Sequence, residues 1–240
     1  MRIFVIAAAA VVALGAVPAG SVPYEARAPH VRQGPMLSDP TFVGAISDAR
    51  LREIVADIHA GRNEIAKRKL VLFLNAVPGN VQAIEILGTL MQNEGNLDQA
   101  VQLLQQGAKM APQQVSLRVR LAIALMNQRK FDEAAPHLQY AIEQEPDNAL
   151  ALANYAWLLT SLGHDRQAID AYERLRAPEL AKQVDPTDVF VGLSVLYERL
   201  GQFEKTIALL APQLEKVSAP HDNNRLFLNL ADAYVRTGKP

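Results

Sequence analysis

The sequence repeats itself every 34 residues. Prolines, alanines and glycines all keep this period: Pro78, Pro112 and Pro146; Ala66, Ala100, Ala134 and Ala168; and Gly61, Gly95 and Gly163. Arg129 stands in the slot where the glycine series has a gap. Self-similarity at a fixed period of about 20–50 residues is the signature of stacked structural units. The chain is therefore expected to fold as an array of similar repeats.

Each full repeat contains two apolar stretches with helical spacing. In the second repeat these stretches are Ile84, Leu87, Gly88 and Met91, then Ala100, Leu103, Leu104 and Gly107. Gly95 lies between them, and glycine tolerates the positive φ that ends a helix and turns the chain back. Pro112 closes the repeat, because a residue before proline avoids the helical conformation. Each repeat is predicted to be an antiparallel helix hairpin whose apolar face the next repeat covers.

The same positions of each repeat hold a leucine followed by a small residue, a large residue, a glycine, an alanine and a closing proline. The second repeat shows them as Leu87-Gly88, Met91, Gly95, Ala100 and Pro112. This pattern resembles the tetratricopeptide repeat family over about residues 47–238. The resemblance implies an all-α fold, a right-handed α-α superhelix (solenoid) of helix hairpins. The repeats are 47–80, 81–114, 115–148, a longer 149–186, a longer 187–223 and a C-terminal half unit 224–240, together forming one domain, 47–240.

Several positions depart from the family pattern. In the first repeat Glu53 and Asp57 occupy slots that are usually apolar, and we expect them on a solvent-facing side of a terminal helix. Pro178 and four extra residues in the fourth repeat predict a break in the stack between Leu175 and Asp188. Pro212 predicts a kink in the second helix of the fifth repeat, because proline lacks the amide donor.

The N-terminus is a separate segment. Met1-Arg2 is followed by fifteen uncharged residues and then by small residues, the layout of a secretory signal peptide at residues 1–20. Cleavage near Ala19 and retention as a signal anchor both remain open, because residues 3–22 have about the length that spans a bilayer. Residues 21–46 contain four prolines and no helical period, so they are predicted to be a flexible Pro-rich arm. We expect a periplasmic or otherwise exported protein, or one signal-anchored to the inner membrane.

Composition argues against several functional classes. The net charge of −1 is spread evenly, so a nucleic-acid partner is not expected. The chain has no Cys, its five His are dispersed, and no nucleotide-binding or nucleophile motif occurs, so we expect no catalytic residues, no cofactor and no metal. The single basic run, Lys67-Arg68-Lys69, is predicted on one exposed helix surface. The membrane is expected to be a partner only through the N-terminal segment, if that segment is uncleaved.

The resemblance also implies where a partner binds. In the family, the ligand-facing slots of each repeat are the second, fifth, ninth, twelfth and thirteenth. Carried over to this chain, they give a partner-binding groove with an apolar centre and polar ends; its residues are Val119, Ile123, Met126, Asn127, Leu150, Ala153, Trp157, Val191 and Val195. Trp157 is the only tryptophan, and it either anchors the partner or packs between neighbouring first helices.

The expected function is that of a non-catalytic scaffold or adaptor of the cell envelope. A partner protein is expected to lay an extended peptide or a helix in the groove. The setting is an assembly, secretion, pilus or polysaccharide-export complex, by analogy with other exported repeat proteins. The alternative is a regulatory scaffold subunit of a membrane-bound synthase or peptidoglycan enzyme.

Overall fold

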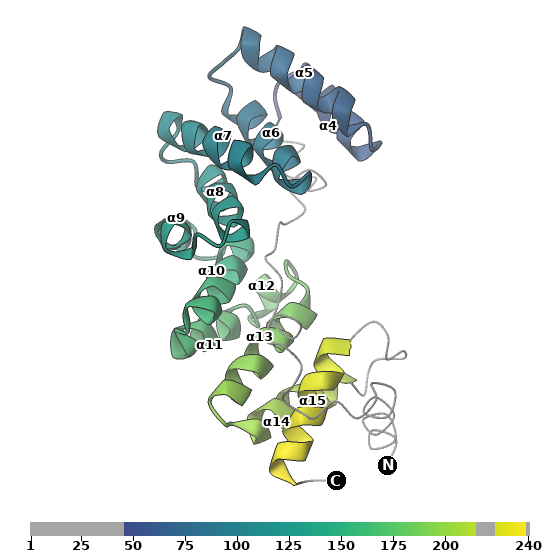
Figure 1. The fold of residues 1–240 in the computed structure, drawn as a ribbon, viewed down its shortest axis with the longest axis vertical. Coiled ribbons are helices and arrows are strands. Elements are labelled where there is room, and N and C mark those ends of the chain that lie inside the picture. Colours follow the sequence, from purple (N-terminus) through teal and green to yellow (C-terminus); the bar gives the residue numbers. More distant parts are fainter. Residues whose placement is uncertain (1–45, 215–223, 239–240) are drawn as a thin grey trace. The chain divides into compact units, whose positions relative to one another are not determined.

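The computed structural model describes residues 46–214 and 224–238. All twelve regular elements in these ranges are helices, and none is a strand, so the expected all-α class is confirmed (Figure 1). The predicted signal segment and all but the last residue of the predicted arm lie outside the described residues.

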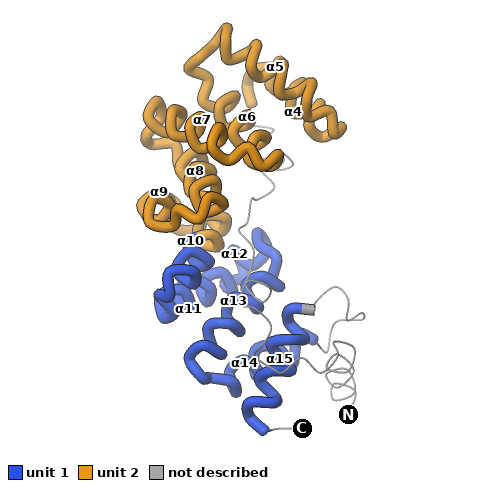
Figure 2. Tube along the Cα trace, in the orientation of Figure 1, with its two compact units in different colours: residues 1–30, 155–240 blue, residues 31–154 orange. Residues whose placement is uncertain are grey.

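The chain divides into two compact modules, with the boundary after Asn154 (Figure 2). Among the described residues, the N-terminal module contains 46–154 (orange) and the C-terminal module contains 155–214 and 224–238 (blue). The helices of the N-terminal module are α4 (Ala49–His59), α5 (Asn63–Ala76), α6 (Val81–Asn93), α7 (Leu97–Met110), α8 (Val115–Asn127) and α9 (Phe131–Gln144). The boundary falls within α10 (Ala149–Leu162). The C-terminal module continues with α11 (Asp165–Arg174), α12 (Pro178–Ala181), α13 (Pro186–Arg199), α14 (Phe203–Leu214) and α15 (Asn224–Thr237).

The turn between the two helices of each pair has one conformation. The chain reverses at a residue with positive φ, and these residues are Gly61, Gly95, Arg129, Gly163 and Gly201. The amide that follows donates to a carbonyl five residues back, as from Asn96 to Met91 at 2.9 Å, which is the Schellman end of a helix. Left-handed backbone costs glycine nothing because glycine has no Cβ. This requirement explains the periodic glycines, and Arg129 adopts the same conformation with a φ of 61°.

The second helices of the first three pairs end before the periodic prolines. α5 ends two residues before Pro78, and α7 and α9 end at the same distance from Pro112 and Pro146. These ends agree with the role expected of the prolines, since the residue before a proline avoids the helical region.

Small residues bring the paired helices close together. A Cβ on Gly88 of α6 would lie 2.7 Å from the Leu104 side chain of α7. In return, a Cβ on Gly107 of α7 would lie 2.7 Å from the Ile84 side chain of α6. Neither distance fits a real carbon atom, so any larger residue would push the two helices apart.

The C-terminal module is irregular where the fourth repeat has its four extra residues. The chain leaves α11 after Arg174, forms the short helix α12, and enters α13 at Pro186. Helix α15 packs against both α14 and α13, so it covers the last helix pair. Pro212 lies inside α14, which continues to Leu214; the kink expected there stays a prediction.

Candidate functional site

Helix α10 carries the predicted partner-binding residues that remain partly exposed. Leu150, Ala153 and Trp157 are spaced three and four residues apart, so they lie on one side of this helix. All three are partly exposed, and so is Asn127 at the end of α8. Further along α10, the Ser161 hydroxyl donates to the Trp157 carbonyl at 3.0 Å, which turns this polar group back onto its own helix.

The other five predicted residues are buried. Val119, Ile123 and Met126 are at most 2% exposed in the N-terminal module, and Val191 and Val195 are at most 4% exposed in the C-terminal module. Val119 and Ile123 pack in one cluster with small residues of the neighbouring helices. The apolar centre expected at an accessible surface therefore forms part of the core of each module. The partner-binding role of the set stays a prediction; its partly exposed members are three residues of α10 and Asn127 of α8.

Polar residues of α6 and α8, the first helices of two neighbouring repeats, contact one another. The Ser116 hydroxyl of α8 donates to Glu85 Oε2 of α6 at 3.0 Å, and Arg120 Nε lies 4.0 Å from Glu85 Oε1. Glu85 and Arg120 are 1% and 5% exposed. Burial raises the pKa of Glu85, and the Arg120 charge and the Ser116 hydrogen bond oppose this shift. These groups therefore join α6 to α8; Glu85 and Arg120 are buried, and Ser116 is partly exposed.

The C-terminal module uses its polar positions in the same way. Arg225 of α15 donates to Asp188 of α13 at 2.9 Å. Arg199 of α13 donates to the Thr160 carbonyl at 2.9 Å and pairs with Asp165 at 2.9 Å. Neighbouring helices of this module are thus joined by ion pairs and by a side-chain hydrogen bond to a backbone carbonyl.

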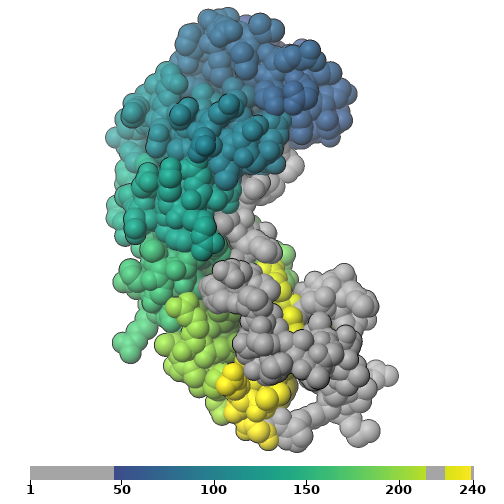
Figure 3. Space-filling view, viewed as in Figure 1, coloured from purple at the N-terminus to yellow at the C-terminus, as the bar shows by residue number. Residues whose placement is uncertain are grey.

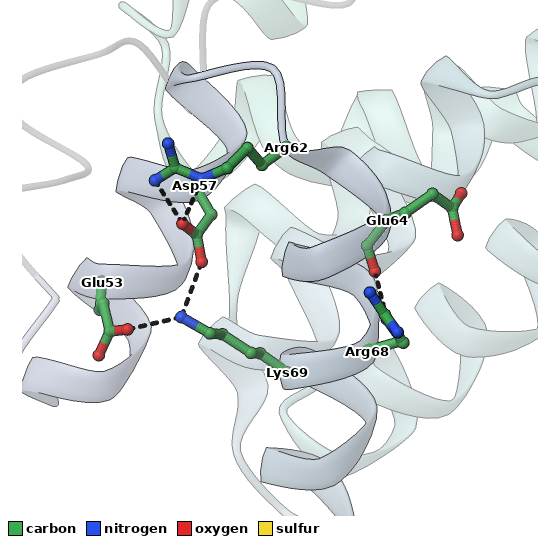
Figure 4. Close-up of polar contacts among 6 residues, drawn as sticks. All are labelled: Glu53, Asp57, Arg62, Glu64, Arg68 and Lys69. Atoms are coloured by element: carbon green, nitrogen blue, oxygen red, sulfur yellow. Dashed lines mark hydrogen bonds and ion pairs between the residues drawn. The ribbon is translucent and has the colours of Figure 1, made fainter.

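A cluster of charges surrounds Asp57 in the first helix pair (Figure 4). Its side chain is only 7% exposed, and Arg62 donates to Oδ1 from Nη2 at 2.6 Å and from Nε at 2.9 Å. Lys69 Nζ lies 2.8 Å from Oδ2 and 2.5 Å from Glu53. Lys69, and then Arg62, hold the pKa of Asp57 below its usual value. The expectation that Asp57 faces solvent is wrong, because two cations from the following turn and helix compensate its burial.

The basic run Lys67-Arg68-Lys69 does not form one exposed basic surface, so that expectation is also wrong. Lys67 binds Glu64 at 2.9 Å and Glu94 at 2.6 Å, and Lys69 belongs to the Asp57 cluster. Arg68 donates from Nε to the Glu64 carbonyl at 3.4 Å. Within the described residues, Arg68 has no carboxylate partner.

A small apolar cavity, which sequence reasoning missed, lies in the irregular region of the C-terminal module. It encloses about 130 Å³ and is formed where α11, α12 and α13 meet; its lining residues are Leu175, Arg176, Ala181, Val184, Pro186, Val189 and Phe190. The four extra residues of the fourth repeat were the signal for it, since they supply α12.

Residues 46–214 and 224–238 contain no group of three or more His, Asp or Glu side chains placed to hold a metal ion. Over the same residues, every helix is too short or too polar to cross a lipid bilayer.

Sequence comparisons identify the repeats. The model of the family described as "Tetratricopeptide repeat" matches residues 91–135 and 126–185. The TPR repeat-containing protein YpiA of Bacillus subtilis (strain 168) is 26% identical over 193 residues, which cover 78% of this chain and 43% of that protein. The chain therefore spans less than half the length of this relative.

Solved structures share the fold. MamA (AMB-1) matches with a TM-score of 0.59 at 23% identity, over 70% of this chain and 97% of that one. TTC0263, a thermophilic TPR protein of Thermus thermophilus, matches with a TM-score of 0.56 at 18% identity, over 78% and 97%. Likeness at this level of identity concerns the fold alone. With the 34-residue period, the helix pairs and the glycine turns, the sequence matches show that the chain carries repeats of the tetratricopeptide repeat family.

Proposed function

We propose that the chain is a non-catalytic scaffold of the cell envelope that holds a segment of a partner protein against the first helices of its repeats. The repeats support the coarser part, because tetratricopeptide repeats are typically protein-interaction modules without catalytic residues. The observation that carries the proposed site is the side of α10 with Leu150, Ala153 and Trp157. Leu150, Ala153 and Trp157 stay partly exposed, whereas the counterparts of Ala153 and Trp157 on α8 and α13 are buried; these are Val119, Ile123, Val191 and Val195.

The chemistry of this side suits an apolar anchor. A partly exposed tryptophan supplies a large contact area at a small entropic cost, which is why tryptophan is enriched at binding hot spots. The charged groups at neighbouring positions are already paired inside their modules, as Glu85 is with Ser116 and Asp188 with Arg225. The partner is therefore expected to be held by apolar contacts, and its affinity to change little with ionic strength.

The cell-envelope setting rests on residues 1–20, which have the layout of a secretory signal. The partner classes proposed are subunits of assembly, secretion, pilus or polysaccharide-export complexes, by analogy with other exported repeat proteins. Fractionation of cells that express the full chain tests the setting directly. Recovery of the protein in the cytosol alone would contradict the cell-envelope setting but not the scaffold function.

The binding side is tested by photo-crosslinking in cells. A photoreactive benzoylphenylalanine at position 157 is expected to capture one discrete partner protein. The matched control is the same amino acid at Gln106, an exposed residue of α7, where no such product is expected. Equal products from both positions, or none from position 157, would contradict the proposed site. A captured synthase or hydrolase would favour the regulatory-subunit alternative, and captured secretion or pilus subunits would favour the proposal.

A further inference from the structure

The outer side of α5 gathers exposed apolar side chains. Seven large hydrophobic residues are exposed in the described part of the chain, and four of them lie on α5 or at its end; these are Ile65 (38%), Val71 (43%), Leu72 (68%) and Val77 (38%). Met110, also exposed at 45%, borders the same end, since its methyl group would be 3.4 Å from a Cβ on Gly79. In Figure 3 the first helix pair, α4 and α5, is the dark blue part of the surface.

This exposure is more than an outer helix face needs. Ala66, Leu70 and Phe73 already face the core of the module from the other side of α5. Ile65, Arg68 and Leu72 are spaced three and four residues apart, so they share one outward side. Contiguous exposed apolar side chains of this kind mark surfaces that meet another molecule.

The positive charge of the first repeat indicates that the molecule bound by this side of α5 is anionic. Residues 47–80 contain six basic and four acidic groups, a formal charge of +2 in a chain whose net charge is −1. Each acidic group has a basic partner in the hairpin; the pairs are Asp48–Arg50, Glu53–Lys69, Asp57–Arg62, Asp57–Lys69 and Glu64–Lys67. The two remaining cations are Arg52 and Arg68, whose described partners are backbone carbonyls. Arg68 lies between Ile65 and Leu72, so an uncompensated guanidinium sits inside the apolar surface.

We propose that this side of α5 docks on an anionic phospholipid surface, with Leu72 and Ile65 entering the interface and Arg68 binding a lipid phosphate. An apolar helix face with basic groups is the composition that lies in the plane of a membrane interface. Guanidinium matches phosphate oxygens in a two-point geometry. A second copy of the chain is a poorer occupant, because it would bring a second Arg68 to the same surface. The inference goes beyond the proposed scaffold function and does not depend on α10.

A local fluorescent probe tests the docking separately from any anchoring by the N-terminal segment. The chain has no Cys, so Asn75→Cys in the full-length protein places one environment-sensitive nitrobenzoxadiazole label on the exposed part of α5. Vesicles of phosphatidylethanolamine and phosphatidylglycerol are expected to shift its emission to the blue. The same label at Gln106→Cys, on α7, is expected not to respond. Leu72→Ser should weaken the response about tenfold and Arg68→Gln about fivefold, whereas Val235→Ser, at a comparably exposed valine, should leave it unchanged.

The proposal is overturned if the label on α5 does not respond to these vesicles, or if it responds equally to neutral phosphatidylcholine. A blue shift without vesicles that grows with protein concentration would also overturn it, because a second copy would then cover the face. Unchanged helicity and melting of the Leu72→Ser and Arg68→Gln proteins, both altered at exposed positions, are expected and show that a lost response reports lost docking.

Discussion

The first helix pair and the last three helices both bury polar side chains. The interactions that stabilise these buried side chains differ between the two regions. In α4–α5 the buried group is the Asp57 carboxylate, with Arg62 at 2.6 Å and Lys69 at 2.8 Å. In α13–α15 the Asp232 carboxylate is also buried, with Arg236 3.7 Å away, but the hydrogen bonds that join the helices at their core are between neutral groups. Asn229 donates to the Ser194 hydroxyl at 2.7 Å, and that hydroxyl donates to the Val191 carbonyl at 2.9 Å.

Exposure explains the difference. The side chains of Arg62 and Lys69 are 52% and 37% exposed, so the cations that compensate Asp57 keep part of their hydration. Ser194 and Asn229 are fully buried, where a charge would lose its hydration without recovering it. The two regions should therefore respond differently to pH and salt, although both are helix pairs of one repeat family.

The largest effect is expected from the neutral network. Asn229→Leu keeps the volume but removes the donor to the Ser194 hydroxyl, and a buried polar group left without its partner costs about 2 kcal/mol of unfolding free energy. Chemical denaturation followed by circular dichroism measures this loss. Asn75→Leu, at an exposed asparagine of α5, is the matched control, with a change within about 0.5 kcal/mol. Equal effects of the two substitutions would show that the network contributes nothing.

The stability of the Asp57→Asn protein, measured as a function of pH, should reveal the contribution of the ion pairs around Asp57. The pKa of Asp57 is lowered in the folded protein, so its contribution to stability is fully present above the unfolded value of about 3.9 and is lost as pH falls through the folded pKa. The stability difference between wild type and Asp57→Asn should therefore be large at neutral pH and shrink near pH 3. Asp132→Asn, at an exposed aspartate of α9, serves as the control substitution. A pH-independent difference for Asp57→Asn would contradict the ion-pair assignment.

The contribution of Glu85, in the same module, should change with pH in the opposite direction to that of Asp57. Burial raises its pKa, and its nearest guanidinium atom is 4.0 Å away, so ionised Glu85 is less well compensated than Asp57. A raised folded pKa means that its favourable contribution is present below the unfolded value of about 4.3 and is lost as pH rises through the folded pKa. Relative to Glu85→Gln, the wild type should gain stability as pH falls toward 4. If it loses stability instead, Glu85 is a paired carboxylate like Asp57.

Salt should produce the smallest effect. At 1 M ionic strength the Debye length is about 3 Å, and the partly exposed cations around Asp57 are within reach of screening. The difference between wild type and Asp57→Asn should fall modestly from low to high salt, whereas that for Asn229→Leu should stay constant. Denaturation series at two salt concentrations measure both. If salt changes the stability difference for Asn229→Leu as much as that for Asp57→Asn, the distinction between a charged cluster and a neutral network is contradicted.

The helix pairs could be predicted from the sequence because their limits depend on local backbone chemistry. Gly95 ends a helix with positive φ, and Pro112 stops the next one, whatever lies around them. Even Arg129, which lacks the freedom of glycine, adopts the turn that the period requires. The short helix α12 occupies the place where four extra residues interrupted the repeat.

The candidate site was less predictable because burial depends on residues far apart in the sequence. The family slots mark Val119 and Ile123 as ligand-facing, but these side chains pack in a cluster with Ala141 and Ala151. Asp57 looked solvent-facing because its two cations come from the next turn and helix. No periodic signal indicated that Gly192 packs so closely under the Tyr172 ring that a Cβ there would overlap it.

The proposal that partner proteins bind at α10 is tested most directly by the fluorescence of Trp157, the only tryptophan in the chain. A synthetic peptide covering the segment captured from position 157 is titrated into the full-length protein, and binding is followed in parallel by calorimetry. We predict that Trp157 emission shifts with a saturation curve that matches the calorimetric one. Binding detected by calorimetry with unchanged Trp157 emission would place the partner elsewhere and contradict the site.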